Sequence, residues 1–208
     1  MGIAERKLKE KQARIRQIKK SAASLFQKKG FEETRMDEIA KRAEISKATI
    51  YLYFKSKEDL FYELVQEQLT NLSQNLIEIY NKEKNQENAI RAIMESTYSF
   101  YTDAPEVYHM ITQFKARELA KVLSADKIKH LKESMRSNLK YLAMTITDGV
   151  EQGKFASVDP TLTAVLFWNM FMGIVQFQEN RLDVGKKDYR KVTVDAGIEF
   201  LLRAMKKA

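Results

Sequence analysis

Residues 37–60, DEIAKRAEISKATIYLYFKSKEDL, contain two short helical patterns separated by a two-residue turn at positions 44–45. Ser46 directly precedes the second pattern and is a favoured N-cap residue. Ile50 and Phe54 lie four residues apart in that pattern, so both should pack inward. We therefore predict two short helices joined by a tight turn, which is the arrangement of a helix-turn-helix module.

The segments on either side of this stretch fit such a module. Upstream, an apolar stripe at helical spacing runs to Phe26, and Gly30 is a typical helix stop. Thr34 is expected to begin the next helix, with Asp37 three residues on in the acidic position of a capping box. Downstream, Ser56 should cap a helix that extends over 57–81, a length of about 40 Å at 1.5 Å per residue.

The composition favours an all-α fold. Only 7 Gly and 2 Pro occur among the 208 residues, too few for an architecture built from strands and turns. Helical patterns continue beyond the long helix near 86–102, 105–122, 124–152, 160–181 and 187–206. We therefore predict about nine helices in all.

The charge distribution points to an anionic partner. The net charge is +8, and residues 1–63 contain 16 basic against 10 acidic side chains. Such an excess suits nucleic acid or an anionic membrane surface. Residues 6–20 could form a membrane-binding amphipathic helix, but this segment has a thin apolar face and lacks the aromatic anchors of such helices. A solvated helix with phosphate contacts is favoured for it.

The chain has no cysteine, which is compatible with a reducing cytosol. Its most apolar run, 164–175, contains Asn169 and is shorter than the roughly 20 residues that span a bilayer. We expect a soluble, cytoplasmic protein that does not bind membranes.

The second helix of the module is expected to face DNA. If Ile50 and Phe54 pack inward, Lys47 and Tyr51 point outward, where they can contact phosphates. Tyr51 could instead be an ordinary core aromatic. The small Ala48 would permit close approach to base edges.

Residues over positions 12–65 resemble the TetR family of bacterial transcriptional regulators. The matching positions are Gly30-Phe31, Thr34, Asp37-Glu38-Ile39-Ala40, Ala43, Ile45-Ser46-Lys47, Thr49-Ile50-Tyr51, Tyr53-Phe54 and Ser56-Lys57-Glu58-Asp59-Leu60. Two positions depart from the family, since Glu44 and Ala48 stand where glycine is frequent. A glutamate in a left-handed turn conformation costs roughly 1 kcal/mol, which packing can offset.

The resemblance implies a DNA-binding surface and a division of the chain. Lys47 and Ala48 are expected nearest the bases, and most other contacts should reach phosphates. The expected DNA-binding residues are Thr34, Ser46, Lys47, Ala48, Thr49, Tyr51, Leu52, Tyr53 and Lys57. The expected segments are a flexible basic N-terminal arm at 1–11, a helix-turn-helix DNA-binding domain at 12–56, a connecting helix at 57–81, and a ligand-binding and dimerisation domain at 82–208.

The helix at 160–181 is apolar almost all the way round, so we expect it to be covered on both sides. Its own domain can cover one side, and a second subunit is expected to cover the other. The small Gly173 and Gly197 could allow close helix approach. In TetR-like proteins the last two helices form a two-fold four-helix interface, which agrees with a homodimer.

The resemblance also implies a small-molecule pocket among the helices beyond the DNA module. The expected ligand-binding residues are Tyr98, Tyr101, His109, Met110, Gln113, Phe114, Met144, Trp168, Phe171 and Met172, each of which could equally be a core residue. We predict a repressor that leaves a pseudo-palindromic operator when an apolar or amphipathic ligand binds. A DNA-binding dimer without a ligand is the alternative.

An enzyme of unknown class is a further, weaker alternative. No glycine-rich phosphate loop, nucleophile elbow or histidine-centred catalytic group can be assembled from this sequence. The two histidines are far apart, and no cluster has metal-ligand spacing. We therefore predict that the chain is not an enzyme and that it binds no metal and no cofactor.

Overall fold

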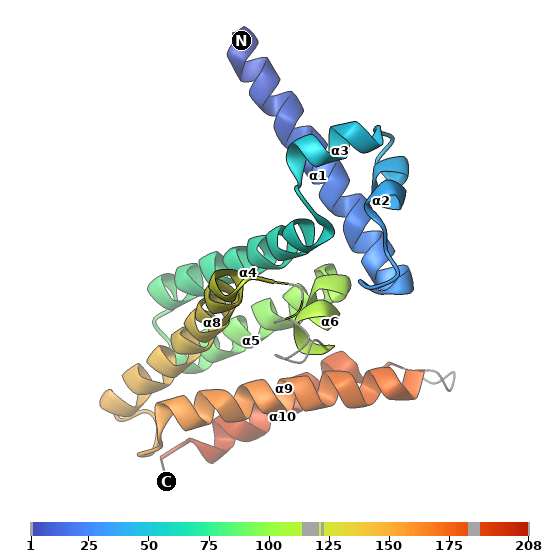
Figure 1. Cartoon of the computed structure of the whole chain (residues 1–208). Coiled ribbons are helices and arrows are strands. Elements are labelled where there is room, and N and C mark those ends of the chain that lie inside the picture. Colours follow the sequence, from blue (N-terminus) through green and yellow to red (C-terminus); the bar gives the residue numbers. More distant parts are fainter. Residues whose placement is uncertain (1, 114–120, 122, 183–187, 208) are drawn as a thin grey trace. The chain divides into compact units, whose positions relative to one another are not determined.

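The computed structural model describes residues 2–113, 121, 123–182 and 188–207, and helices dominate these residues (Figure 1). The helices are α1 (Ile3–Lys29), α2 (Met36–Arg42), α3 (Lys47–Tyr53), α4 (Lys57–Lys82), α5 (Gln86–Asp103), α6 (Pro105–Gln113), α8 (Ala125–Glu151), α9 (Pro160–Leu182) and α10 (Arg190–Ala204). The predicted all-α fold is confirmed. The predicted helix over 105–122 is found only as far as Gln113, because positions 114–120 and 122 lie outside the described residues.

The chain forms two compact units. The N-terminal unit comprises Met1–Gln68 with Asp103–Lys132, and the C-terminal unit comprises Leu69–Thr102 with Glu133–Ala208. Both α4 and α8 contribute residues to each unit.

The N-terminal unit is built around three aromatic rings from α1, the loop after it and α4. The Phe31 and Phe61 rings meet edge to face with centroids 5.0 Å apart, and Phe26 lies 5.4 Å from Phe31. Ile39 of α2 and Ile50 of α3 are fully buried in the same unit. Edge-to-face rings add to the stabilisation that burial supplies.

Helix α1 begins earlier than the sequence indicated. Residues 1–11 were expected to form a flexible arm, but the helix starts at Ile3. The segment is rich in strong helix formers, and it adds two exposed i,i+4 ion pairs, Glu5–Lys9 and Arg6–Glu10. A helix already nucleated by the packed part of α1 extends into such a sequence at little cost.

The C-terminal unit has its core between α9 and α10 and the helices that they contact. Phe167 and Phe171 of α9 and Leu202 of α10 are fully buried. The expected close approach at Gly197 is confirmed, because a Cβ atom there would lie 2.4 Å from the Met170 sulfur. Gly173 does not serve this purpose within the protomer, since nothing lies within 4 Å of its Cβ position.

Candidate nucleic-acid interface and ligand-binding residues

The turn between α2 and α3 has the conformation that the sequence analysis anticipated. Glu44 has a φ of +54°, in the left-handed region that favours glycine. The Ile45 amide donates to the Ala40 carbonyl at 3.0 Å, and the Glu44 amide donates to the Lys41 carbonyl at 3.2 Å. These bonds satisfy carbonyls at the end of α2 and close the turn.

Helix α3 is capped at its start and anchored on one face. Ser46 is the N-cap, and its hydroxyl accepts from the Thr49 amide at 3.0 Å. Ile50 and Phe54 are buried, as predicted. This anchoring fixes which side chains of α3 point into solvent.

The outward face of α3 combines an apolar side chain with polar neighbours. Leu52 is 83% exposed and Tyr51 is 44% exposed, both high values for large apolar or aromatic side chains. Ser46, Lys47 and Ala48 are also exposed, whereas the other expected contact residues on this helix, Thr49 and Tyr53, are partly covered. Of the two large exposed side chains on this face, Leu52 is therefore the more available to a partner.

Lys47 is already paired in the free protein. Its Nζ donates to Asp37 Oδ2 at 2.9 Å, and this hydrogen bond raises the pKa of the lysine. Both side chains are more than half exposed, so the pair can open without a large cost. Asp37 therefore competes with any phosphate for Lys47, a role that the sequence did not suggest.

The position of Thr34 differs from expectation. Its side chain is 1% exposed, and its hydroxyl donates to the Gly30 carbonyl at 2.7 Å, so it satisfies the end of α1 and is not presented to DNA. Arg35, not Thr34, is the N-cap of α2. The acidic position of the capping box is occupied by Glu38 and not by Asp37, since Glu38 Oε2 accepts from the Arg35 amide at 2.9 Å.

Lys57, at the start of α4, binds the loop that follows α1. Its Nζ donates to the Phe31 carbonyl at 2.6 Å and to the Glu32 carbonyl at 3.1 Å, and it lies 4.2 Å from the centre of the Phe31 ring. These contacts hold the cation at a helix N-terminus, where the helix dipole disfavours it. Contact between Lys57 and a DNA phosphate remains a prediction.

The family model described as bacterial regulatory proteins, tetR family, matches residues 18–64. This span contains the packed part of α1, the α2–turn–α3 arrangement and the start of α4. The predicted resemblance of this part of the chain to the TetR family is confirmed. Its helix-turn-helix match and its relatives make it a DNA-binding transcriptional regulator and not an enzyme.

Similar proteins support this assignment over most of the chain. The uncharacterised helix-turn-helix transcriptional regulator YhgD of Bacillus subtilis is 28% identical over 162 residues, which cover 76% of this chain and 80% of YhgD. The structure of FadR from Bacillus subtilis in complex with stearoyl-CoA is similar with a TM-score of 0.73 at 20% identity, covering 91% of this chain and 98% of FadR. The structure of AibR in complex with isovaleryl coenzyme A and operator DNA is similar with a TM-score of 0.72 at 21% identity, covering 91% of this chain and 98% of AibR. At these identities the two structures show a shared fold.

The expected ligand-binding residues fall in both compact units. In the C-terminal unit, the Tyr98 and Tyr101 rings lie 5.9 Å apart, and the Trp168 and Phe171 rings lie 6.0 Å apart. Tyr101 and Phe171 are buried in the core, whereas Tyr98, Met144, Trp168 and Met172 are partly covered. These pairs lie on α5 and α9.

The remaining four expected residues belong to the N-terminal unit. His109 of α6 is partly covered and lies edge-on to the Tyr108 ring, with centroids 5.7 Å apart. Met110 and Gln113 also belong to α6, and Phe114 lies outside the described residues. A ligand-binding role for the ten residues stays a prediction.

A partly buried polar network in the C-terminal unit was not found from the sequence. The Tyr101 hydroxyl donates to Glu179 Oε1 at 2.7 Å and accepts from Arg190, which also binds Asp188 with its Nη2 at 2.6 Å. Burial, together with the neighbouring Glu179 carboxylate, raises the pKa of Tyr101, and the Asp188 carboxylate raises that of Arg190. Because these side chains come from α5, α9 and the start of α10, no local pattern could have joined them.

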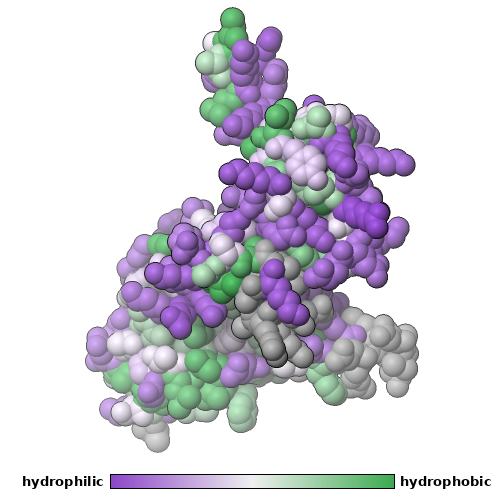
Figure 2. Space-filling view, in the orientation of Figure 1, coloured by the Kyte–Doolittle hydropathy of each residue, from purple (hydrophilic) through white to green (hydrophobic). Residues whose placement is uncertain are grey.

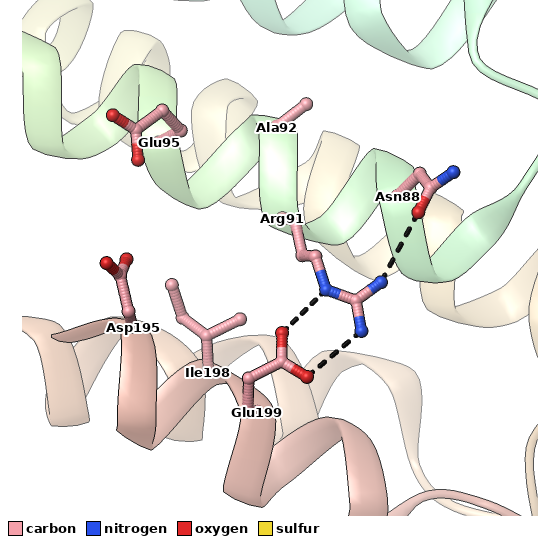
Figure 3. A pocket seen from close by; sticks show the side chains of 7 residues that line it. All are labelled: Asn88, Arg91, Ala92, Glu95, Asp195, Ile198 and Glu199. Atoms are coloured by element: carbon pink, nitrogen blue, oxygen red, sulfur yellow. Dashed lines mark hydrogen bonds and ion pairs between the residues drawn. The ribbon is translucent and has the colours of Figure 1, made fainter. Parts of the chain in front are cut away.

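An open groove of about 470 Å³ lies between α5 and α10 (Figure 3). Arg91 donates to both carboxylate oxygens of Glu199, at 2.6 and 3.0 Å, across this groove. Lys191 nearby binds Glu95 and Asp195 at 2.8 and 2.6 Å. None of the expected ligand residues whose side chains the structure describes lines this groove, and the charged residues that line it are all ion-paired.

Proposed function

We propose that the protein acts as a homodimer that binds a pseudo-palindromic operator in the cytoplasm, with one α3 helix in each of two major grooves. The observation that carries this proposal is the exposed face of α3, where Leu52 and Tyr51 stand beside Ala48 and Lys47. An apolar side chain can contact a thymine methyl group, while hydroxyl and ammonium groups bind phosphates. A two-fold protein binds a DNA site of matching symmetry.

A second exposed surface supports the homodimer. Leu162, Leu166 and Phe177 on α9 are at least half exposed, and so are Val192 and Phe200 on α10. On α9, Leu162, Leu166, Gly173 and Phe177 follow one another at intervals of four, seven and four residues, so they lie along one face of the helix, and Gly173 leaves room there for a partner helix. We call the face formed by these five apolar residues the α9–α10 face. A second copy would bury it.

Segment Pro160–Glu179 of α9 is also long and apolar enough to cross a bilayer by length and composition, and little of it is buried within the protomer. One such helix is weak support for a membrane span, because core helices pass the same test. A helix of a dimer interface is also little buried within an isolated protomer, because the partner covers its apolar face. Association of two copies accounts for the apolar length without a membrane.

The effector that we propose is an amphipathic small molecule, and acyl-CoA thioesters are the class to test first. Two structures with the same fold carry such molecules, FadR with stearoyl-CoA and AibR with isovaleryl coenzyme A. In this chain, Tyr98, Met144, Trp168 and Met172 are partly covered aromatic or flexible side chains that could wall an acyl chain.

Helix α4 is the proposed route of coupling. It runs without interruption from Lys57, which contacts the loop before α2, to Lys82 in the C-terminal unit. A ligand that favours one position of α4 would change the spacing of the two α3 helices, which must match the roughly 34 Å repeat of DNA. Ligand binding then lowers operator affinity, and the protein acts as a repressor that the ligand releases.

The test is a titration of operator binding with acyl-CoA esters of increasing chain length, using free coenzyme A and free fatty acids as controls. The operator is first selected from random duplexes by the protein itself. We expect one range of acyl lengths to weaken operator binding about 5- to 150-fold, and operator DNA to weaken binding of the same ester by the same factor. If no ester binds, the acyl-CoA assignment is wrong. If an ester binds equally well with and without operator, the DNA-binding dimer without an effector is the better description.

A further inference from the structure

The first turns of α1 are not part of the packed N-terminal unit. Positions 2–13 are all exposed, and Ile18 is the first fully buried residue of the helix. In Figure 1 this end of α1 projects past α3 with no other helix beside it. Residues 3–13 extend over about 16 Å at 1.5 Å per residue. Packing therefore does not explain why the helix continues so far.

The positive charge of the N-terminal module is concentrated on this helix. Residues 1–20 contain eight basic and two acidic side chains, whereas residues 21–63, which include α2 and α3, contain eight of each. Residues 21–63, which include α3, therefore carry no net charge. The entire excess of the first 63 residues, six positive charges, lies on the first two-thirds of α1.

Lys19 pairs with Glu63 and Glu67 of α4, but most of the other positive charges are not firmly neutralised within the described protein. The pairs Arg6–Glu10 and Glu5–Lys9 have separations of 3.5 and 3.8 Å and are well exposed, so they hold their cations weakly. Lys7, Lys11, Arg16 and Lys20 form no ion pair with any residue that the structure describes. Figure 2 shows hydrophilic side chains along one side of the projecting helix and hydrophobic ones along the other.

We propose that residues 3–20 of α1 form a second DNA-binding surface, which contacts the phosphates of duplex flanking the base pairs that α3 reads. Duplex DNA carries one negative charge per about 1.7 Å of its axis, so a cationic helix about 16 Å long beyond the packed unit meets several phosphates. Contacts of this kind add affinity without reading sequence. They would supply the attraction that the balanced segment 21–63 lacks.

DNA suits this surface better than a membrane does. The exposed large apolar residues on the projecting turns are Ile3 and Leu8, and the first aromatic residue of the chain is Phe26, which is buried. Helices that lie in a membrane interface use a broad apolar face with aromatic anchors. The same compact unit contains α3, so a duplex bound by α3, as proposed above, would lie near α1.

The test compares two full-length variants that each lose three positive charges. One carries Lys7→Gln, Lys11→Gln and Arg16→Gln; the control carries Lys132→Gln, Lys140→Gln and Lys207→Gln, three exposed lysines outside α1 without an ion pair among the described residues. Glutamine preserves helix propensity, and circular dichroism checks the helix content. The probes are a selected operator with about ten flanking base pairs on each side and the same operator without flanks. A flank of this length is longer than the projecting turns of α1.

On the flanked duplex at about 150 mM salt, the α1 variant should bind at least about 10-fold more weakly than the wild type, and its salt slope should fall by about 2 to 3 units per protomer. The control should stay within about twofold, because it changes only the overall charge. Without flanks, the α1 variant and the control should bind alike. Equal affinities of the two variants for the flanked duplex, or an equal loss with and without flanks, would overturn the proposal. The proposal would also be overturned if the α1 variant lost binding to phosphatidylglycerol vesicles but bound DNA as well as the wild type does. That result would assign the surface to a membrane.

Discussion

Helices α3 and α9 both expose large apolar side chains, and the side chains around them differ. On α3, Leu52 stands among Lys47, Tyr51 and the Ser46 hydroxyl. On α9, exposed apolar residues follow one another along the helix, and α10 adds Val192 and Phe200. The first surface is small and rimmed by hydrogen-bond donors, whereas the second is extended and mainly apolar.

This difference indicates the partner of each surface. A single apolar side chain with donors and a cation beside it matches a DNA groove, where a thymine methyl lies between phosphates. An extended apolar face matches a second protein surface of the same kind, as in isologous dimers. Exposed apolar area alone does not distinguish the two partners; the charge and polarity beside it do.

The largest effect is expected from a charge in the middle of the α9–α10 face. Leu166→Glu should raise the dimer dissociation constant at least about 100-fold, because a carboxylate would be buried against the partner without a counter-ion. Sedimentation equilibrium measures this directly. Gln152→Glu introduces the same charge at an exposed position outside the five residues of that face and should leave the dimer intact. A Leu166→Glu protein that still dimerises would remove α9 from the interface.

The choice of residue 166 follows from the structure. Phe171 and Leu202 would have been natural targets from sequence alone, but both are fully buried within the protomer. A charge at either position would unfold the C-terminal unit before it tested the dimer.

A smaller effect is expected from trimming the apolar side chain of α3. Leu52→Ala should weaken binding to the selected operator about 5- to 30-fold, from the loss of its contact with the base edge. Thermal stability should be nearly unchanged, because Leu52 is 83% exposed. Leu162→Ala, the same substitution at an exposed position on α9, should leave operator affinity unchanged when measured above the dimer dissociation constant. Equal operator affinities of Leu52→Ala and the wild type would show that α3 does not read bases through this residue.

Asp37→Asn should tighten DNA binding by a few-fold, because it releases Lys47 and removes a carboxylate near the phosphates. Random-sequence duplex should gain at least as much as the operator, so specificity should fall. Glu32→Gln, which removes one exposed negative charge elsewhere in the module, measures the general charge effect. If the two variants gain equally, the Lys47–Asp37 pair has no role of its own in DNA binding.

The smallest effect concerns the turn. Glu44→Gly should stabilise the protein by about 1 kcal/mol, since glycine adopts the observed positive φ without strain. For a chain of this size, that corresponds to about 2–4 °C in melting temperature. Calorimetry measures it, and a lower melting temperature would show that Glu44 is held by favourable contacts that outweigh its backbone strain.

The sequence predicted the N-terminal module in detail because its signals are local. The Ser46 cap, the inward Ile50 and Phe54, and the left-handed Glu44 each depend on neighbours within a few residues. The hydrogen bonds of Thr34 and Lys57 are made with the loop after α1, and local patterns did not predict them.

The C-terminal unit was predicted less sharply for the opposite reason. A helix that is apolar all round, such as α9, has no periodicity that tells its core face from its outer face. The structure separates them, with Phe171 inside and Leu166 outside. The network of Tyr101, Glu179 and Arg190 joins residues more than 70 positions apart and could not be found by pattern.

The most direct test of the two-surface account is hydroxyl-radical footprinting of the intact protein, read by mass spectrometry at Tyr51, Phe177 and Phe200. All three side chains are exposed in the protomer, at 44%, 61% and 72%. We predict that Phe177 and Phe200 are protected in the concentrated protein without DNA and become reactive on dilution or in Leu166→Glu, whereas Tyr51 stays reactive until operator duplex is added. Phenylalanines as reactive in the concentrated protein as in Leu166→Glu, or a Tyr51 whose reactivity operator DNA does not change, would contradict the account.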